Sequence, residues 1–301
     1  MNYPKISIIT VNLNNAAFLE ETIQSVLNQN YPNLEYIIID GGSTDGSMDL
    51  IKKYESRLAY WESNADEGYG YALKKGLERS TGEIMGWLNS DDLHLPGSLF
   101  TIAEIFQSNA PISWITGFPS WSSASGFHLG EMPHTEESVP YWAKRYDLYQ
   151  KYSRWSRIRY LGGDYLAIQQ ESTFWRRSLW EKAGATINTS YKLAADTELW
   201  CRFFRHENLF TVNCVLAAFR QGGEKQLTQI KRKEYFQESL RALEEARKML
   251  PLAERMSYQL RFHLAQLLKP LYYLDFPFGF LYEMLLQFPP VIHPDGQTPK
   301  K

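Results

Sequence analysis

Apolar runs alternate with amphipathic segments across the first ninety residues of the chain. The run at residues 6–11 is rich in β-branched side chains, further apolar runs lie at 34–40 and 84–88, and a shorter one lies at 58–61. Runs that are apolar throughout are typical of strands buried on both faces of a parallel sheet. The segments between them repeat apolar side chains at helical spacing. The alternation therefore predicts an α/β fold, with a Rossmann-like mixed, mainly parallel sheet flanked by helices.

Polar residues stand where these predicted strands end. Thr10 lies at the end of the first strand and Asp40 at the end of the second, while Asp66 and Asp91 follow the third and the fourth. In an open α/β sheet, ligands bind outside the carboxyl ends of the strands. We therefore expect these side chains to gather at one edge of the sheet.

Two adjacent carboxylates, Asp91 and Asp92, follow the run at 84–88. Neighbouring carboxylates repel each other unless a cation or hydrogen-bond donors neutralise them. One interpretation is a site for a hard divalent ion that itself binds a diphosphate. The other is a solvated turn that caps the helix predicted after Pro96. These residues alone leave both interpretations open.

Composition narrows the possible classes of protein. The net charge of −2 gives no reason to expect a nucleic acid as a partner. Cys201 and Cys214 are too few for a disulfide framework or a zinc cluster, which favours a reducing compartment. Residues 1–5 lead directly into a strand rather than a signal peptide, and the apolar stretch at 271–292 is interrupted by prolines and acids. We expect a cytoplasmic protein.

The character of the sequence changes near residue 225. The region from 120 to 163 is irregular and aromatic, and helical patterns are predicted over 175–184 and 196–204. Beyond 225, two helical patterns of mixed charge follow each other. We predict a domain at 1–225 and a helical extension at 226–301, which packs as a cap or else contacts a membrane surface or a second copy of the chain.

Several ordered motifs together resemble family 2 glycosyltransferases, over residues 5–225. They are ISIITVN at 6–12, IDGGSTDGS at 39–47, DEG at 66–68, TGEI at 81–84, NSDD at 89–92, QESTFWR at 170–176 and DTELWCR at 196–202. An ordered set of motifs is far more specific than any one of them. The resemblance implies the GT-A nucleotide-sugar-binding fold and transfer with inversion at the sugar carbon.

The resemblance assigns the first motifs to the nucleotide. Asp40 is expected to accept a hydrogen bond from the base, which favours uracil or thymine because an ionised acid cannot donate. Thr10 and Asn12 are expected to line the same pocket, largely through their backbone, and Asp66 to lie near the base and the ribose. The alternative for Asp40 is a helix-capping acid, and for Asp66 a solvated loop acid.

In NSDD, the resemblance assigns Asp91 to the ribose and Asp92 to Mg²⁺ or Mn²⁺, the two acids together forming the metal-binding motif. Asp196 matches the general base, which takes the proton of the acceptor hydroxyl on the face opposite the leaving group. Relatives have Glu before this acid, whereas this chain has Ala195, and Glu198 is a candidate to compensate. Asp196 is alternatively a helix cap.

Further residues are expected around the diphosphate and the acceptor. Arg220 and Lys225 are candidates to close over the diphosphate, although the His that relatives carry in this stretch is missing. Gln170 and Glu171 are candidates for hydrogen bonds to the acceptor. A minority of the tryptophans at 121, 142, 155 and 175 is expected to present a ring face to a sugar.

The expected function is metal-dependent, inverting transfer of a sugar from a UDP- or dTDP-sugar to a hydroxyl of a glycan or lipid-linked acceptor in cell-surface polysaccharide synthesis. Two alternatives stay open. One is a degenerate, non-catalytic nucleotide-sugar-binding subunit, which Ala195 and the missing His favour. The other is a nucleotidyltransferase, although the residues after the first strand are not a Gly-rich basic phosphate loop.

Overall fold

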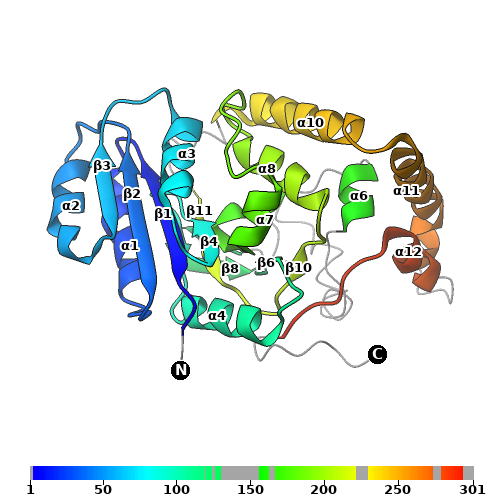
Figure 1. Cartoon of the computed structure of the whole chain (residues 1–301), viewed down its shortest axis with the longest axis horizontal. Coiled ribbons are helices and arrows are strands. Elements are labelled where there is room, and N and C mark those ends of the chain that lie inside the picture. Colours follow the sequence, from blue (N-terminus) through cyan, green and yellow to red (C-terminus); the bar gives the residue numbers. More distant parts are fainter. Residues whose placement is uncertain are drawn as a thin grey trace.

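A seven-stranded mixed sheet forms one half of the molecule, and helices of the C-terminal region form the far end (Figure 1). The computed structural model describes residues 3–118, 120–123, 126–129, 156–162, 167–221, 230–273 and 279–293. The strand order is β10-β6-β9-β4-β1-β2-β3. In chain order the strands are β1 Ile6–Asn12, β2 Leu34–Asp40, β3 Tyr60–Ser63, β4 Ile84–Trp87, β6 Trp114–Thr116, β9 Thr173–Arg176 and β10 Phe210–Thr211.

Strand β1 lies between β2 and β4 and runs parallel to both. The register pairs Asn12 with Asp40, so the ends of β1 and β2 meet at the same edge. Strand β3 continues the parallel order beyond β2. The predicted α/β fold with a mainly parallel sheet is therefore confirmed, and its carboxyl edge carries the predicted polar residues.

Strand β9 is the antiparallel exception, inserted between β4 and β6. The sequence predicts helix from about Trp175, but the structure has strand to Arg176 and then helix α7, Arg177–Lys182. The strand is buried on both faces, because Phe174 packs into one hydrophobic cluster and Trp175 into the other. Gly86 on β4 makes room for it, since a Cβ there would lie 2.8 Å from the Phe174 ring.

Helices cover both faces of the sheet, as the alternation predicts (Figure 1). On one face, α1 and α4 bury Leu19 and Ile102 against the side of β1 that carries Ile8. On the other face, α3, α7 and α8 pack against the side that carries Ile9. Helix α3 approaches β1 closely at Gly76, where a Cβ would lie 2.4 Å from the Ile9 side chain. The helices of these layers are α1 Ala16–Leu27, α2 Ser47–Lys53, α3 Tyr69–Arg79, α4 Ser98–Ser108, α7 Arg177–Lys182 and α8 Ala195–Phe204.

A smaller sheet lies beside the carboxyl edge, in the order β5-β11-β7-β8. Its strands are β5 Leu93–His94, β7 Ser120–Ser123, β8 Gly126–Leu129 and β11 Ala217–Arg220. Strand β11 pairs with β5 directly after the acidic motif, and this pairing brings the end of β11 to the site.

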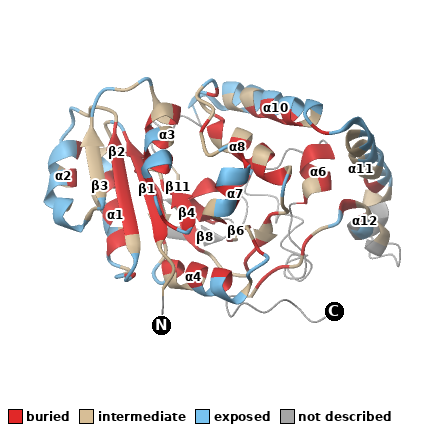
Figure 2. Cartoon of the chain, viewed as in Figure 1, coloured by how far each residue is buried: buried red, intermediate tan, exposed pale blue. Residues whose placement is uncertain are grey.

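The C-terminal helices are α10 Arg232–Lys248, α11 Leu252–Tyr273 and α12 Gly279–Leu286. Helix α10 buries Ala242, Leu243 and Ala246 in the hydrophobic cluster that contains α8 (Figure 2). After α12 the chain returns to the sheet, where the backbone N–H of Ile292 donates to the Thr211 carbonyl at 2.9 Å. The division at residue 225 stays a prediction, and α10 shares the core of the preceding region. None of the described helices is long and apolar enough to cross a membrane.

Candidate active site

A buried hydrogen-bond network around Asp40 joins the ends of β1 and β2. Oδ1 of Asp40 accepts from Asn12 Nδ2 at 2.7 Å and from Ser43 Oγ at 2.6 Å. Oδ2 accepts from Ser63 Oγ at 2.6 Å and from the backbone N–H groups of Gly42 and Ser43. Burial acts to raise the pKa of Asp40, but the donors around it outweigh burial and hold the pKa below its ordinary value.

This network fills the acceptor sites of Asp40, since a carboxylate offers about four lone-pair positions. The side chain therefore holds the loop that follows β2, and direct contact of Asp40 with a base stays a prediction. The Thr10 side chain is also buried, with Oγ1 3.0 Å from Tyr36 Oη. Contacts of Thr10 with a nucleotide would accordingly come from its backbone.

Asp66 lies against the same loop. Its Oδ1 accepts from the Gly68 backbone N–H at 2.8 Å, and a Cβ on Gly41 would lie 3.5 Å from this oxygen. Its Oδ2 is buried and has no hydrogen-bond donor among the described residues. An acceptor in this state can bind a hydroxyl or N–H of a ligand.

The acidic pair follows β4 at this edge, and the Asp92 carboxyl is fully buried. Its Oδ1 accepts from the Arg220 backbone N–H at 3.0 Å. Its Oδ2 accepts from Gln170 Nε2 at 3.2 Å and from Asn89 Nδ2 at 3.4 Å. Asp91 is partly exposed, and its carbonyl oxygen accepts from Arg220 Nε at 2.8 Å. Three separate segments of the chain thus hold the pair, and Gln170 contacts Asp92 directly.

Glu171, on the short helix η3 Gln170–Ser172, adds a third carboxyl to this cluster. Its side chain is buried, and Oε1 has no donor among the described residues. Burial raises the pKa of Glu171 to about 8, and the charges of Asp91 and Asp196 also raise it. Burial, with the charges of Glu171 and Asp91, likewise raises the pKa of Asp92. The arrangement concentrates negative potential and suits a cation.

Tyr69 and Asn89 belong to the same cluster, although the sequence motifs predict no role for either. Trp87 Nε1 donates to Tyr69 Oη at 3.1 Å, and Tyr69 Oη donates to Asn89 Oδ1 at 3.1 Å. Burial raises the pKa of Tyr69, and the charges of Asp196 and Asp92 add to this. Tyr69 directly follows the DEG motif and Asn89 is the first residue of NSDD, and this proximity to the motifs was the sequence signal that could have indicated a role for them.

Asp196 lies in the first turn of α8, after the N-cap Ala194. Its Oδ2 accepts from Tyr235 Oη at 2.9 Å, whereas Oδ1 is buried without a donor among the described residues. Burial raises the pKa of Asp196 to about 6, although hydrogen bonds from the Thr197 backbone and Tyr235 act in the opposite direction. A carboxylate with a pKa near neutral is suited to accept a proton in catalysis.

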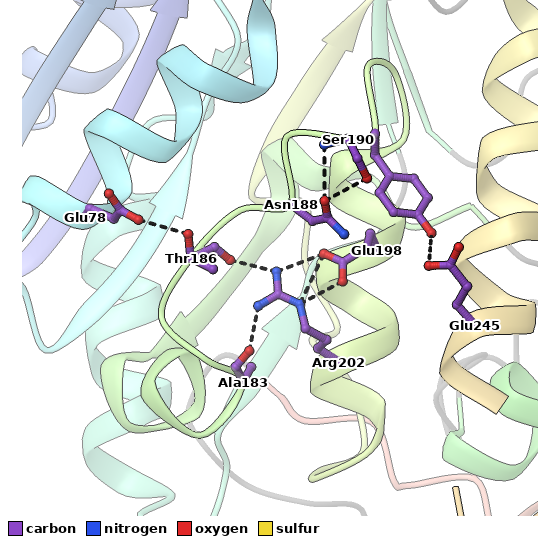
Figure 3. Close-up of polar contacts among 9 residues, drawn as sticks. Glu78, Ala183, Thr186, Asn188, Ser190, Glu198, Arg202 and Glu245 are labelled. Atoms are coloured by element: carbon purple, nitrogen blue, oxygen red, sulfur yellow. Dashed lines mark hydrogen bonds and ion pairs between the residues drawn. The ribbon is translucent and has the colours of Figure 1, made fainter. Parts of the chain in front are cut away.

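Arg202 fixes α8 to the loop that precedes it (Figure 3). Its Nε and Nη2 donate to the Glu198 carboxylate, at 3.0 and 2.9 Å. Its Nη1 donates to the Ala183 carbonyl at 2.6 Å, and Nη2 donates to the Thr186 carbonyl at 2.7 Å. Glu198 is thereby engaged in holding the helix, rather than standing in for the acid that relatives have at Ala195.

Arg220 ends β11 beside the acidic pair. Its guanidinium forms an ion pair with Glu21 of α1 at 2.5 Å and lies over the Phe18 ring, 4.8 Å from the centroid. The structure therefore places Arg220 beside Asp91 and Asp92, and its contact with a diphosphate stays a prediction. Lys225 lies outside the described residues.

Trp175 is a core residue, so it is not one of the minority of tryptophans expected to present a ring face to a sugar. It is fully buried, with its ring 5.4 Å from Trp87 and 5.7 Å from Trp200. Trp87 and Trp200 stack at 5.3 Å beneath the site. Trp142 and Trp155, together with the Trp121 side chain, are not among the described parts of the chain.

The residues at this edge fit a divalent ion that shares its ligands with a substrate. No three His, Cys, Asp or Glu side chains within the described ranges form a group that holds a metal alone. Asp92 and Asp91 offer oxygen ligands of the kind that Mg²⁺ and Mn²⁺ prefer. Mg²⁺ is commonly bound by one or two carboxylates plus substrate phosphates and water, so two acids suffice.

The mixed sheet and its acidic carboxyl edge define the GT-A class of fold. Residues 7–182 match the model of glycosyl transferase family 2, and the chain belongs to this family. Asp196 and Arg220 lie beyond the matched residues.

Among curated relatives, TuaG of Bacillus subtilis is 34% identical over 143 residues, which cover 46% of this chain and 56% of that protein; its name places it in teichuronic acid biosynthesis. The uncharacterized glycosyltransferase Rv1514c of Mycobacterium tuberculosis is 27% identical over 222 residues, covering 73% of this chain and 76% of the relative. The chain thus spans little more than half the length of TuaG.

Two solved structures share the fold at low identity. S. aureus TarS 1–349 in complex with UDP-GlcNAc superposes with a TM-score of 0.64 at 14% identity, covering 86% of this chain and 71% of that one. The mannosyltransferase PcManGT of Pyrobaculum calidifontis, in complex with GDP-Man and Mn²⁺, gives a TM-score of 0.62 at 16% identity, covering 88% and 71%.

Proposed function

We propose that this chain is a metal-dependent, inverting glycosyltransferase that moves a sugar from a nucleoside-diphosphate sugar to a hydroxyl group. One observation carries the proposal. Gln170 Nε2 donates to Asp92 Oδ2 at 3.2 Å, which places the acidic pair beside Glu171, and the charges of both Asp91 and Asp196 raise the pKa of Glu171, so the proposed metal acids and the proposed base belong to one cluster. A transferase needs both functions within the length of one sugar.

In this reaction the Asp196 carboxylate takes the proton of the acceptor hydroxyl while the hydroxyl oxygen forms a bond to the anomeric carbon. The bond between that carbon and the diphosphate oxygen breaks on the opposite face, and its electron pair leaves with the nucleoside diphosphate. A divalent ion held by Asp92 and Asp91 would neutralise the charge that develops on the leaving group. Arg220 would add a positive charge on the same side.

We propose a UDP- or dTDP-sugar as the donor and a glycan or lipid-linked hydroxyl as the acceptor. The TarS complexes with UDP-GlcNAc and UDP support a uridine nucleotide. PcManGT binds GDP-Man on the same fold, so a guanosine nucleotide is the comparison to include. The name of TuaG supports a role in cell-surface polysaccharide synthesis.

We also propose that α11 lies on an anionic membrane surface, at the end of the molecule opposite α2 (Figure 2). Its outer face exposes Leu252, Met256, Leu260, Leu264 and Leu267, from 42% to 75%. Residues 230–273 carry nine Lys and Arg against five Glu, a net charge of +4, whereas the whole chain carries −2. An apolar stripe on a basic segment is typical of helices that lie in a lipid interface.

Vesicle flotation tests this contact. The chain should float with vesicles that contain phosphatidylglycerol and not with pure phosphatidylcholine, and Met256→Glu should abolish flotation. Met48→Glu, an exposed methionine on α2, is the matched control and should not change it. Equal flotation of both variants would overturn the lipid contact, and a concentration-dependent dimer lost in Met256→Glu would assign the face to a second copy.

Nucleoside diphosphate release tests the transferase activity. With Mn²⁺, the purified chain should release the nucleoside diphosphate from one member of a panel of UDP-GlcNAc, UDP-Glc, UDP-GlcA, dTDP-Glc and GDP-Man. Asp196→Asn should lower the rate roughly a hundredfold or more while nucleotide binding persists. Binding without release by the wild type would favour the non-catalytic subunit. Pyrophosphate formation from UTP and a sugar phosphate would favour a nucleotidyltransferase.

A further inference from the structure

A hydrogen bond joins the proposed base to the C-terminal helix α10. Tyr235 Oη donates to Oδ2 of Asp196 at 2.9 Å, across 39 positions of the chain. The residues that match the family model end at 182, so neither partner lies within them. No sequence motif in α10 predicts this contact.

Two further contacts, both on the C-terminal side of Tyr235, fix α10 to the residues that precede α8. The Glu238 carboxylate accepts from the backbone N–H groups of Leu193 and Ala194, at 2.8 and 3.0 Å, immediately before α8 begins. Two turns further along α10, Glu245 accepts from the Tyr191 hydroxyl at 2.7 Å (Figure 3). Ser239 is fully buried between these anchors. These contacts fix the position of α10, and therefore the position of the Tyr235 side chain relative to Asp196.

The two oxygens of Asp196 differ in their surroundings. Oδ2 accepts the Tyr235 hydroxyl, while Oδ1 is buried without a donor among the described residues. A bond to one oxygen fixes the plane of a carboxylate, whose terminal torsion otherwise has a broad distribution. It also stabilises the charged form, which burial disfavours. Oδ1 is thereby the oxygen left to accept the proton of a substrate hydroxyl.

We propose that Tyr235 is a positioning residue for the general base, and that α10 therefore completes the active site of this chain. The inference rests on the proposed function, because it gives Tyr235 a role through Asp196. The C-terminal helix is then part of the catalytic machinery rather than a separate appendage.

The test compares Tyr235→Phe with Tyr191→Phe. Both variants remove a tyrosine hydroxyl that bonds to a carboxylate across the contact between α10 and the α8 region, but only the first touches Asp196. With the donor that the wild type consumes from the panel above, Tyr235→Phe should lower kcat about fivefold to tenfold. Its KM for the donor should not change, and Tyr191→Phe should keep the wild-type kcat.

The pH profile separates positioning from a structural role. The titratable groups that face Asp196 are Tyr69 of α3, Glu171 of η3 and Tyr235 of α10. Because the Tyr235 hydroxyl favours the charged form of Asp196, Tyr235→Phe should shift the acid limb of kcat to higher pH. Tyr191→Phe should leave that limb in place. A kcat and an acid limb equal to the wild type in Tyr235→Phe would overturn the inference.

A readout without turnover keeps the inference distinct from the proposed function. The Asp196 carboxyl resonance in ¹³C NMR, assigned by its loss in Asp196→Asn, should titrate at higher pH in Tyr235→Phe than in the wild type. An unchanged titration would overturn the inference even where transfer is active. Full activity of Asp196→Asn would instead overturn the base, and the positioning role would fall with it.

Discussion

The backbone N–H of Arg220 donates to Oδ1 of Asp92 at 3.0 Å, across 128 positions of the chain. The bond ties the end of β11 to the acidic motif that follows β4. Because the donor is a backbone group, replacing the Arg220 side chain does not remove it. The orientation of Asp92 and the positive charge of Arg220 can therefore be tested separately.

Arg220→Ala should weaken donor binding while Asp92 keeps its orientation. The loss of one charged contact with a diphosphate should raise the KM for the donor roughly tenfold, and Mn²⁺ dependence should persist. Steady-state kinetics over a series of Mn²⁺ concentrations measures both effects. Glu21→Gln, which removes only the ion pair with α1, is the comparison and should not raise the KM. Equal KM values in Arg220→Ala and the wild type would contradict the assignment.

We expect Asp92→Asn to raise the stability of the metal-free protein and to lower its transferase activity. Burial raises the pKa of Asp92, so its charge is a cost to the folded protein in the absence of a cation. The new amide is accommodated here, because Gln170 has a buried Oε1, without a donor among the described residues, that accepts the amide N–H when the Gln170 side chain turns over. The variant should therefore unfold at a higher urea concentration than the wild type, yet lose the metal-dependent stabilisation by UDP and roughly a hundredfold or more in kcat. Thermal shift with UDP, with and without Mn²⁺, is the measurement. Unchanged stabilisation by UDP and Mn²⁺ would remove Asp92 from the metal site.

Glu171 should make the stability of the metal-free protein fall as pH rises. Its pKa is raised from 4.5 to about 8 in the folded state. A group with a raised folded pKa stabilises the fold fully below its unfolded pKa and loses that contribution as pH rises through the folded value. The melting temperature should therefore decline between about pH 4.5 and 8, and Glu171→Gln should flatten the decline. A parallel decline in both proteins would assign the effect to other groups.

Asp40→Asn should damage the loop after β2. The new amide places N–H groups against donors from Asn12 and Ser43, so buried donors lose their acceptor. We expect a loss of about 2–3 kcal/mol in the free energy of unfolding, measured with urea, together with weaker nucleotide binding. Asp49→Asn, an exposed acid on α2, is the control and should change neither. A stable Asp40→Asn that binds no nucleotide would instead support direct contact with the base.

The order of the first elements was predictable because the information is local. Buried parallel strands require continuous apolar runs, and β1, β2 and β4 fall on the runs at 6–11, 34–40 and 84–88. Strand β9 was harder, because Phe174 and Trp175 suit a strand or a buried helix equally. Only the pairing of this segment with β4 and β6 makes it a strand rather than a helix.

The sequence by itself determined the fold class, the family and the acids at the ends of the strands, because each depends on residues close together in the chain. The tertiary structure decided which groups form hydrogen bonds with those acids. Asp40 faces inward to Asn12 and Ser43, Glu198 is engaged by Arg202, and Asp196 receives Tyr235. Except for the Glu198–Arg202 and Asp40–Ser43 pairs, such partners are joined by packing across the chain rather than by local spacing. A carboxylate's charge and orientation depend on these neighbours, and no local motif encodes them.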